Sequence, residues 1–192
     1  MLQRVMWKSV VAVIAASACS FDAASAADGT LDPTFGVDGL ARAGITDGDL
    51  QPSGCRPVVQ PDDKIVICGT RLANGASGSD FLVARFNADG SLDTTFGNAG
   101  LATIDFDHGT GSDQADGVAL QSDGSIVVAG TTRGTESGSE AFAVARLTQG
   151  GTLDASFGAG TGQSTLEFSD GTGNDQAYAM AVQPDDRIII DG

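Results

Sequence analysis

Aspartate residues recur at a fixed interval along this chain. Asp32, Asp93 and Asp154 lie 61 residues apart, and a phenylalanine follows each of them three positions later. A carboxylate that occurs once per unit could bind a hard cation such as calcium. It could also accept hydrogen bonds from nearby backbone N–H groups and so stabilise a tight turn. We favour the turn, and we expect the accompanying core anchors to be Phe35, Phe96 and Phe157.

The segment FNADGSLD at residues 86–93 is the one that best fits the calcium alternative. Its spacing of oxygen-bearing side chains resembles an EF-hand loop, which makes Asp89 and Asp93 the calcium candidates. The match fails at both ends, because Arg85 stands where the first carboxylate belongs and Phe96 where the bidentate glutamate belongs. No other cofactor or metal is expected.

Two cysteines remain after the N-terminal segment, Cys55 and Cys68. If Gln60 pairs with Lys64 across a hairpin turn, the two cysteines face each other diagonally at the end of that hairpin, within adjustable reach of a disulfide. The sequence is compatible both with a disulfide between them and with two free thiols. Two cysteines without histidine partners argue against a metal site.

Residues for catalysis are few. His108 is the only histidine and lies in a glycine-rich segment, and no nucleophile elbow accompanies it. Paired carboxylates could serve a glycosidase, but nothing marks a particular pair. We therefore predict no catalytic residues and a protein that is not an enzyme. The alternative is a fragment of a propeller-containing hydrolase that acts on carbohydrate.

The elements that position these residues follow from a second repeated motif. QPDDKIVICG, QSDGSIVVAG and QPDDRIIIDG begin at Gln60, Gln121 and Gln183, in steps of 61 and 62 residues. Repetition at such a period indicates stacked supersecondary units. Within a unit, short apolar runs bounded by Gly, Asp, Ser or Asn have the length and punctuation of strands. A β-sandwich would not require a strict repeat.

The sequence therefore predicts an all-β fold of β-propeller-like blades, each a four-stranded antiparallel sheet. About two and a half repeats form an incomplete ring, with units at about 28–88, 89–149 and 150–192. Either a longer reading frame or another chain would complete the last sheet. The expected strands lie near residues 40–45, 56–60, 64–70, 81–86, 101–106, 117–121, 125–131, 141–147, 163–168, 177–183 and 187–190.

The hairpin turn of each unit requires one residue in the left-handed backbone region. Gly124 occupies this place in the second unit, and Asp63 and Asp186 occupy it in the others. Aspartate tolerates positive φ better than most residues, so the turn is expected in all three units.

The motifs DGSLDTTFG, QPDDKIVICG and FLVARFNADG together resemble the bacterial delta-60 repeat family. The resemblance covers nearly all of the chain after residue 26. It implies a β-propeller-type repeat in an exported protein with no settled activity. The chain departs from the family pattern at Asp63 and Asp186, where glycine is usual, and in its small number of units.

Residues 1–26 have the order of a signal peptide: basic residues, an apolar run and Ala24-Ser25-Ala26 as the cleavage site. Cys19 leaves a lipoprotein variant open. Cleavage would change the formal charge from −15 to −16, since the segment carries a net positive charge. So acidic a chain is not expected to bind nucleic acid, and no membrane span is expected to remain.

The remaining repeated motif is Asp113-Gln114-Ala115, which recurs as Asp175-Gln176-Ala177. These residues either line the loop end of a central channel or terminate the preceding loop, and the second reading is favoured. The sequence thus predicts a secreted or periplasmic protein whose loops bind or scaffold an unknown protein or glycan ligand.

Overall fold

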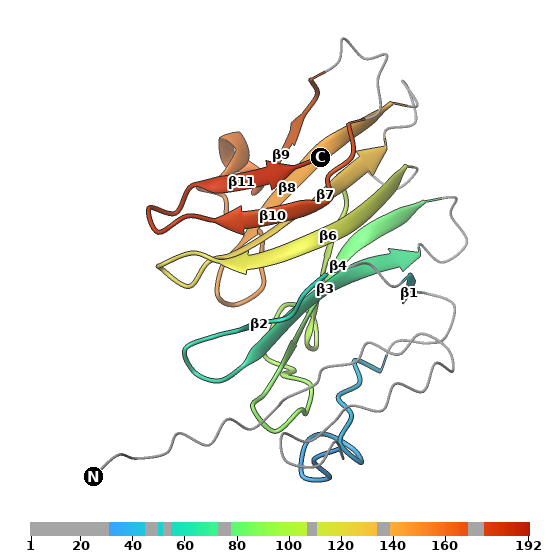
Figure 1. Ribbon diagram of the computed structural model, residues 1–192, viewed down its shortest axis with the longest axis vertical. Coiled ribbons are helices and arrows are strands. Elements are labelled where there is room, and N and C mark those ends of the chain that lie inside the picture. The colour runs from blue at the N-terminus through green and yellow to red at the C-terminus, as the bar shows by residue number, and fades with distance from the viewer. Residues whose placement is uncertain are drawn as a thin grey trace.

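The computed structural model describes residues 31–44, 50–51, 55–72, 78–106, 111–133, 139–168 and 175–192, and these form an all-β structure (Figure 1). Their one helical element is a 3-10 turn, η1 (Gly158–Gly160). The strands are β1 (Leu50–Gln51), β2 (Val58–Val59), β3 (Ile65–Leu72), β4 (Ser79–Phe86), β5 (Leu101–Ile104), β6 (Ser112–Leu120), β7 (Ile126–Arg133), β8 (Glu140–Leu147), β9 (Gln163–Leu166), β10 (Ala179–Val182) and β11 (Ile188–Asp191).

The first blade is built on the hairpin of β3 and β4. These strands pair antiparallel along their whole length, from Ile65 opposite Phe86 to Leu72 opposite Ser79. β5 covers the outer edge of β4, and β1 and β2 share the other edge of β3. The first blade therefore has four strand positions, the innermost of which is interrupted.

The second blade repeats this arrangement as β6, β7, β8 and β9 in antiparallel order. β6 contains a bulge between Ala115 and Gly117. One parallel bridge, from Ser79 to Ser112, joins the two blades. Because that link is a single residue pair, the nine hydrogen-bonded strands form two blades and not one continuous sheet.

The third unit is represented by β10 and β11, a separate two-stranded antiparallel sheet. Figure 1 shows this hairpin beside β6 and β7 of the second blade. The fold is thus an open, β-propeller-like stack of units, as the repeat predicts.

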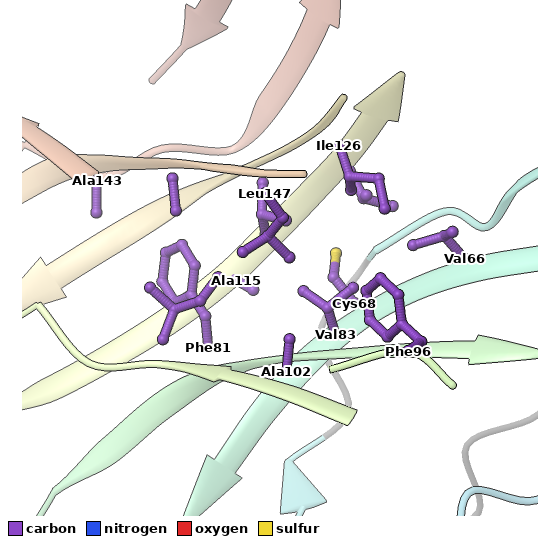
Figure 2. Packing of buried hydrophobic residues seen from close by; sticks show 14 residues of the cluster. Val66, Cys68, Phe81, Val83, Phe96, Ala102, Ala115, Ile126, Ala143 and Leu147 are labelled. Atoms are coloured by element: carbon purple, nitrogen blue, oxygen red, sulfur yellow. The ribbon is translucent and has the colours of Figure 1, made fainter. Parts of the chain in front are cut away.

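The main core lies between the first two blades (Figure 2). Large side chains from one blade, such as Phe81 and Phe96, meet small ones from the next, such as Ala143 and Ala145. This alternation lets neighbouring sheets approach closely while the space between them stays filled. Both faces of β3 and β7 are buried, which explains their continuous apolar sequences.

The predicted hairpin turns are confirmed. φ is 63° at Asp63, 83° at Gly124 and 64° at Asp186. The expected strands from residue 56 onward are confirmed in existence and order; their ends shift, most of all at β6, which begins at Ser112 and not near residue 117.

Two expectations about strands were wrong. In the described part of residues 40–45 there are isolated bridges and no strand, because none of the described residues supplies a strand that pairs with this segment. Asp113-Gln114-Ala115 do not precede their strand but lie inside β6, which begins at Ser112. Residues 35–43 nonetheless cover the first blade, since Phe35, Ala41 and Ala43 pack against Ile65 and Ile67.

The hairpin motifs at Gln121 and Gln183 lie 62 residues apart, one more than the preceding pair, and this extra residue has a structural origin. The N–H of Gly100 bonds to the carbonyl of Phe96, and the N–H of Gly162 bonds in the same way to Phe157. The intervening chain is one residue longer in the second case, and η1 forms within it. The extra residue is therefore absorbed in one turn, and the strands on either side keep their equivalence.

In the part of the chain that the structure describes, no helix has the length and apolar character needed to cross a lipid bilayer.

Candidate functional site

The blades have two distinct ends. At one end lie the hairpin turns and the repeated DGSLDTTFG loops. At the other, here called the open-loop end, β3 and β7 finish while β4, β6 and β8 begin. Three carboxylates gather at the open-loop end: Asp80, Asp105 and Asp113 each place an oxygen within 4.8 Å of the others. This cluster is the candidate site.

Asp113 is completely buried at the centre of the cluster. Its Oδ2 accepts the backbone N–H of Phe106 at 2.8 Å, and its Oδ1 accepts the hydroxyl of Thr132. The Ser79 hydroxyl donates to its backbone carbonyl at 3.0 Å. Asp113 therefore joins the end of the first blade to two strands of its own blade.

The second copy of the motif repeats this role. Asp175 accepts the backbone N–H of Phe168 at 2.7 Å, as Asp113 does from Phe106. Two residues after each aspartate, an alanine donates its N–H to a threonine hydroxyl of the preceding blade. Ala115 donates to Thr70 at 3.2 Å, and Ala177 donates to Thr131 at 3.0 Å. These bonds tie the motif to the preceding blade in both copies, although the first copy lies inside β6 and the second precedes β10.

Hard cations such as calcium prefer carboxylate oxygens, so the cluster has suitable chemistry. Two observations favour a structural role instead. Both oxygens of Asp113 already accept hydrogen bonds from Phe106 and Thr132. The second unit has Ala141 where the first has Asp80, so the complete cluster is not part of the repeat.

The calcium candidate Asp93 is a structural anchor at the opposite end. Its Oδ1 accepts the Thr95 backbone N–H at 3.1 Å and the Thr95 hydroxyl at 2.6 Å. Its Oδ2 lies 2.8 Å from Nε of Arg85 and 3.1 Å from Nζ of Lys64. Burial by itself would raise the pKa of Asp93, but the hydrogen bonds from Thr95 and Lys64 and the charge of Arg85 lower it well below the usual range.

Asp89, the other calcium candidate, is engaged within its own turn. Its Oδ1 accepts the backbone N–H of Ser91 at 2.9 Å and the Ser91 hydroxyl at 2.6 Å. The Ser91 side chain, followed by its backbone N–H, lowers the pKa of Asp89. The two carboxylates thus belong to separate turns, and the one at Asp93 faces two cations.

The other repeated aspartates bond in the same way. Asp154 accepts the N–H of Ser156 at 2.9 Å and pairs with Arg146 at 2.8 Å, and Asp32 accepts the N–H of Thr34 at 2.9 Å. The backbone N–H of Ser156 is the main cause that lowers the pKa of Asp154. The expectation that these aspartates stabilise a turn therefore agrees with their contacts.

Each anchor arginine also stacks on the phenylalanine of its motif. The guanidinium carbon of Arg85 lies 4.7 Å from the ring centre of Phe96, and that of Arg146 lies 5.1 Å from Phe157. Phe35 and Phe96 are buried, whereas Phe157 is only half-buried.

Successive anchor loops stack on one another. The N–H of Gly36 donates to the carbonyl of Asp89 at 2.6 Å, and the N–H of Gly97 donates to Gly150 at 2.8 Å. Gly151 has φ +86°, and a Cβ there would lie 2.7 Å from the N of Gly97 and from the ring of Phe96. The glycine is required because the loop of the preceding unit occupies the space of a side chain.

A contact between turns was not foreseen from the sequence. Asp186, at the tip of the third hairpin, accepts the backbone N–H of Ser122 in the second hairpin at 2.7 Å and also accepts the Ser122 hydroxyl. Its own carbonyl accepts Nε2 of Gln121 at 2.7 Å. Between the first two units the corresponding residues are Pro61, which has no N–H, and Gly124, which has no carboxylate. This paired difference was the signal that could have identified the contact.

The cysteines lie where the hairpin geometry places them. The Cα atoms of Cys55 and Cys68 are 5.6 Å apart, within the range of a disulfide, and their Sγ atoms are in contact. Cys68 is buried in the main core, and Cys55 packs against the same cluster. Cys55 and Cys68 therefore form a candidate disulfide of the first blade.

A cavity of about 380 Å³ lies at the boundary between the second and third units. The aromatic side chains of Phe142, Phe168 and Tyr178 line it, together with Asp175 and the end of β11. His108, the lone histidine, lies outside the described residues, as do residues 1–26.

A comparison with protein families finds one match. The model for a β-propeller domain of unknown function (DUF5122) matches residues 60–96 and 121–157. Each match runs from the glutamine of a hairpin turn to the phenylalanine of the next anchor loop. The chain is thus similar to a β-propeller-type repeat family, as its motifs predict, while the narrower delta-60 assignment stays a prediction. No curated protein matches the chain.

Proposed function

We propose that this chain is a non-catalytic β-propeller scaffold that is exported and presents its open-loop end to a protein or glycan ligand at the cell surface or in the periplasm. The main support is how the repeated polar residues are used. Asp93 and Asp154 bond within their loops, and Asp113 and Asp175 bond between blades. The first pair therefore stabilises individual loops, and the second pair holds neighbouring units together.

Two of the residues that differ between units lie at the open-loop end. Asp80 is replaced by Ala141 in the next unit, and Asp105 by Glu167. Asp80 and Asp105 are half-buried, so both reach the surface. A scaffold with equivalent blades and differing loops is suited to binding, because the loops can vary without a change in the core.

The charge of the chain restricts the ligand class. A formal charge of −15 before any processing disfavours nucleic acid and anionic lipid. A neutral glycan, or a protein surface with basic residues, fits this electrostatic field better. Export rests on residues 1–26, whose composition is that of a signal peptide.

Binding is tested with the purified chain on glycan arrays and on surface fractions of the cell. A double variant, Asp80→Ala with Asp105→Ala, is expected to weaken any specific binding. The matched control is Asp62→Ala with Asp185→Ala, which removes two carboxylates at the hairpin end and is expected to leave binding unchanged. Equal loss in both variants would place the ligand elsewhere or show a charge effect alone.

Catalysis is tested by a screen against polysaccharides and esters. Turnover that Asp105→Asn abolishes would overturn the proposal and favour a carbohydrate-active hydrolase. Export is tested separately by fusing residues 1–26 to a reporter that is active only outside the cytoplasm.

A further inference from the structure

The bulge in β6 is formed by Asp116. Ala115 lies opposite Gly130 and Gly117 lies opposite Ala129, so Asp116 has no partner residue on β7. Such an extra residue leaves the ladder locally interrupted and redirects its own side chain. The contacts of the Asp116 side chain therefore influence how firmly β6 is held at this point.

The three units have different side chains at the bulge position. Cys55 occupies it in the first unit and Tyr178 in the third. The Cα of Cys55 lies 5.6 Å from that of Cys68, whose counterpart in the second blade is Ala129. The first blade thus has a candidate disulfide at the position where the second blade has an ionisable carboxyl group.

The carboxyl group of Asp116 is half-buried, and its two oxygens differ in their contacts. Oδ1 accepts a hydrogen bond at 2.9 Å from Nε2 of Gln114, two residues earlier on the same strand. Oδ2 is buried and accepts no hydrogen bond from the described residues. A buried acceptor without a donor costs free energy, and the cost is larger when the group is ionised.

The charged side chains of β6 and of the strands that pack against it lie away from the bulge, and β2 and β10 carry none. Those charged residues are Arg71 on β3, Asp80 and Arg85 on β4, Arg133 on β7 and Asp113 on β6 itself. Arg85 bonds to Asp93 at the end of the hairpin turns, and the others lie at the open-loop end. Burial therefore raises the pKa of Asp116, and only the hydrogen bond from Gln114 opposes this effect.

The bulge lies between the two neighbouring units. A Cβ added to Gly117 would lie 2.5 Å from Cγ of Met180, so β6 approaches β10 of the third unit closely beside Asp116 (Figure 1). On the preceding side, the N–H of Ala115 donates to the Thr70 hydroxyl of the first blade at 3.2 Å. Opening of the bulge would therefore disturb contacts with both neighbours.

We propose that Asp116 makes the second blade sensitive to pH at the β6 bulge: the neutral carboxyl group keeps the bulge closed, and its ionisation weakens β6 at this point. The neutral acid can carry its proton on Oδ1 and donate it to Oε1 of Gln114 after that amide rotates. Oδ2 is then an uncharged carbonyl oxygen, which is less costly to bury. The candidate disulfide would hold the same position of the first blade without this dependence on pH.

The direction of the pH dependence follows from the raised pKa of Asp116 in the folded chain. The folded chain takes up this proton at a higher pH than the unfolded chain, in which aspartate titrates at about pH 4. The contribution of Asp116 to stability is therefore fully present below about pH 4 and is lost as the pH rises through the folded pKa. Asp93, whose folded pKa is lowered, contributes in the opposite direction.

A carbon-13 NMR titration of the aspartate carboxyl groups in the full chain tests the proposal without a substitution. We expect the pKa of Asp116 to lie above the ordinary aspartate value. The matched control is Asp123 of the same blade, whose pKa is lowered chiefly by the backbone N–H of Ser125. An ordinary or lowered pKa at Asp116, as a bound water or cation at Oδ2 would produce, would overturn the proposal.

The variant Asp116→Asn retains the size of the side chain and removes its titration. The difference in melting temperature between this variant and the wild type is expected to change in favour of the variant as the pH rises from 4 to 7. For Asp123→Asn the difference is expected to change in favour of the wild type, because the pKa of Asp123 is lowered. A difference that stays constant with pH for Asp116→Asn would contradict the proposal.

Amide hydrogen exchange shows whether the bulge itself opens. The N–H of Ala115 bonds to Thr70, and the matched N–H of Ala177 bonds to Thr131 beside Tyr178, which carries no carboxyl group. The protection of Ala115 relative to Ala177, corrected for intrinsic exchange rates, is expected to fall between pH 5 and pH 7 in the wild type and to stay constant in Asp116→Asn. A constant ratio in the wild type would show that ionisation does not loosen β6 and would overturn the proposal.

Discussion

The boundary between the first and second blades and the boundary between the second and third units are built from the same motifs but differ in how completely they are covered. At the first boundary Phe96 is fully buried and Phe106 half-buried. At the second their counterparts are Phe157, half-buried, and Phe168, 72% exposed. Equivalent residues therefore contribute differently to stability in the two copies, because they are buried to different extents.

The largest contrast is expected at the anchor phenylalanines. Phe96→Ala should lower the free energy of unfolding by about 4 kcal/mol, because it removes a fully buried ring and its contact with Arg85. Phe157→Ala, the matched change in the half-buried copy, should cost clearly less. Urea denaturation followed by circular dichroism measures both, and equal losses would contradict the difference in burial.

Loss of an anchor carboxylate should likewise cost more stability in the more buried copy, at Asp93, than at Asp154. Asp93→Asn is expected to cost about 3 kcal/mol, because it leaves buried Arg85 without its charged partner. Asp154→Asn, where both partners are more exposed, should cost less. Chemical denaturation of the two variants at neutral pH measures the difference.

The anchor at Asp93 also predicts a pH dependence. Its folded pKa is lowered, so its contribution is present above the unfolded value of about 4 and is lost as the pH falls towards the folded pKa. Asp93→Asn should therefore flatten the acid side of the stability curve. A wild-type curve and a variant curve that run parallel below about pH 4 would contradict this assignment.

The candidate disulfide strengthens only the first blade. Breaking it with a reductant is expected to lower the free energy of unfolding by about 3 kcal/mol, given the 13-residue separation of Cys55 and Cys68. Cys55→Ser should show the lower stability already and should not respond to the reductant. Titration of free thiols in the unfolded, unreduced chain provides the check. If Cys55 and Cys68 both react as free thiols, the disulfide is absent.

The smallest effect is expected at the turns. Asp186→Gly relieves the strain of a positive φ but loses the bonds to Ser122, while Asp63→Gly relieves the same strain and has no such bond among the described residues. The two variants should therefore differ by about 1 kcal/mol, with Asp63→Gly the more stable. Equal thermal denaturation midpoints would show that the contact between turns contributes nothing.

Much of the fold was accessible from the sequence because its signals are local. The apolar runs, the punctuation by glycine and aspartate, and the turn position shared by Asp63, Gly124 and Asp186 each depend on a few neighbouring residues. The period then related one unit to the next. The segment at residues 40–45 was the exception, because an apolar sequence becomes a strand only where another strand is available to pair with it.

The arrangement of the candidate site was harder to predict from the sequence. The turn role of Asp93 could be predicted, since Thr95 lies two residues away, but its contact with Lys64 joins distant parts of the sequence. The gathering of Asp80, Asp105 and Asp113 likewise depends on three different strands or strand ends. Neither arrangement leaves a pattern in a single stretch of the chain.

The sequence by itself determined the period, the strands, the hairpin geometry and the acidic character of this protein, because each of these is a property of composition or of near neighbours. Only the tertiary structure decided which copy of each motif is buried and which aspartate bonds across units. The physical reason is that burial and hydrogen bonding between units depend on what lies against a residue, and equal sequences in unequal surroundings acquire different energies.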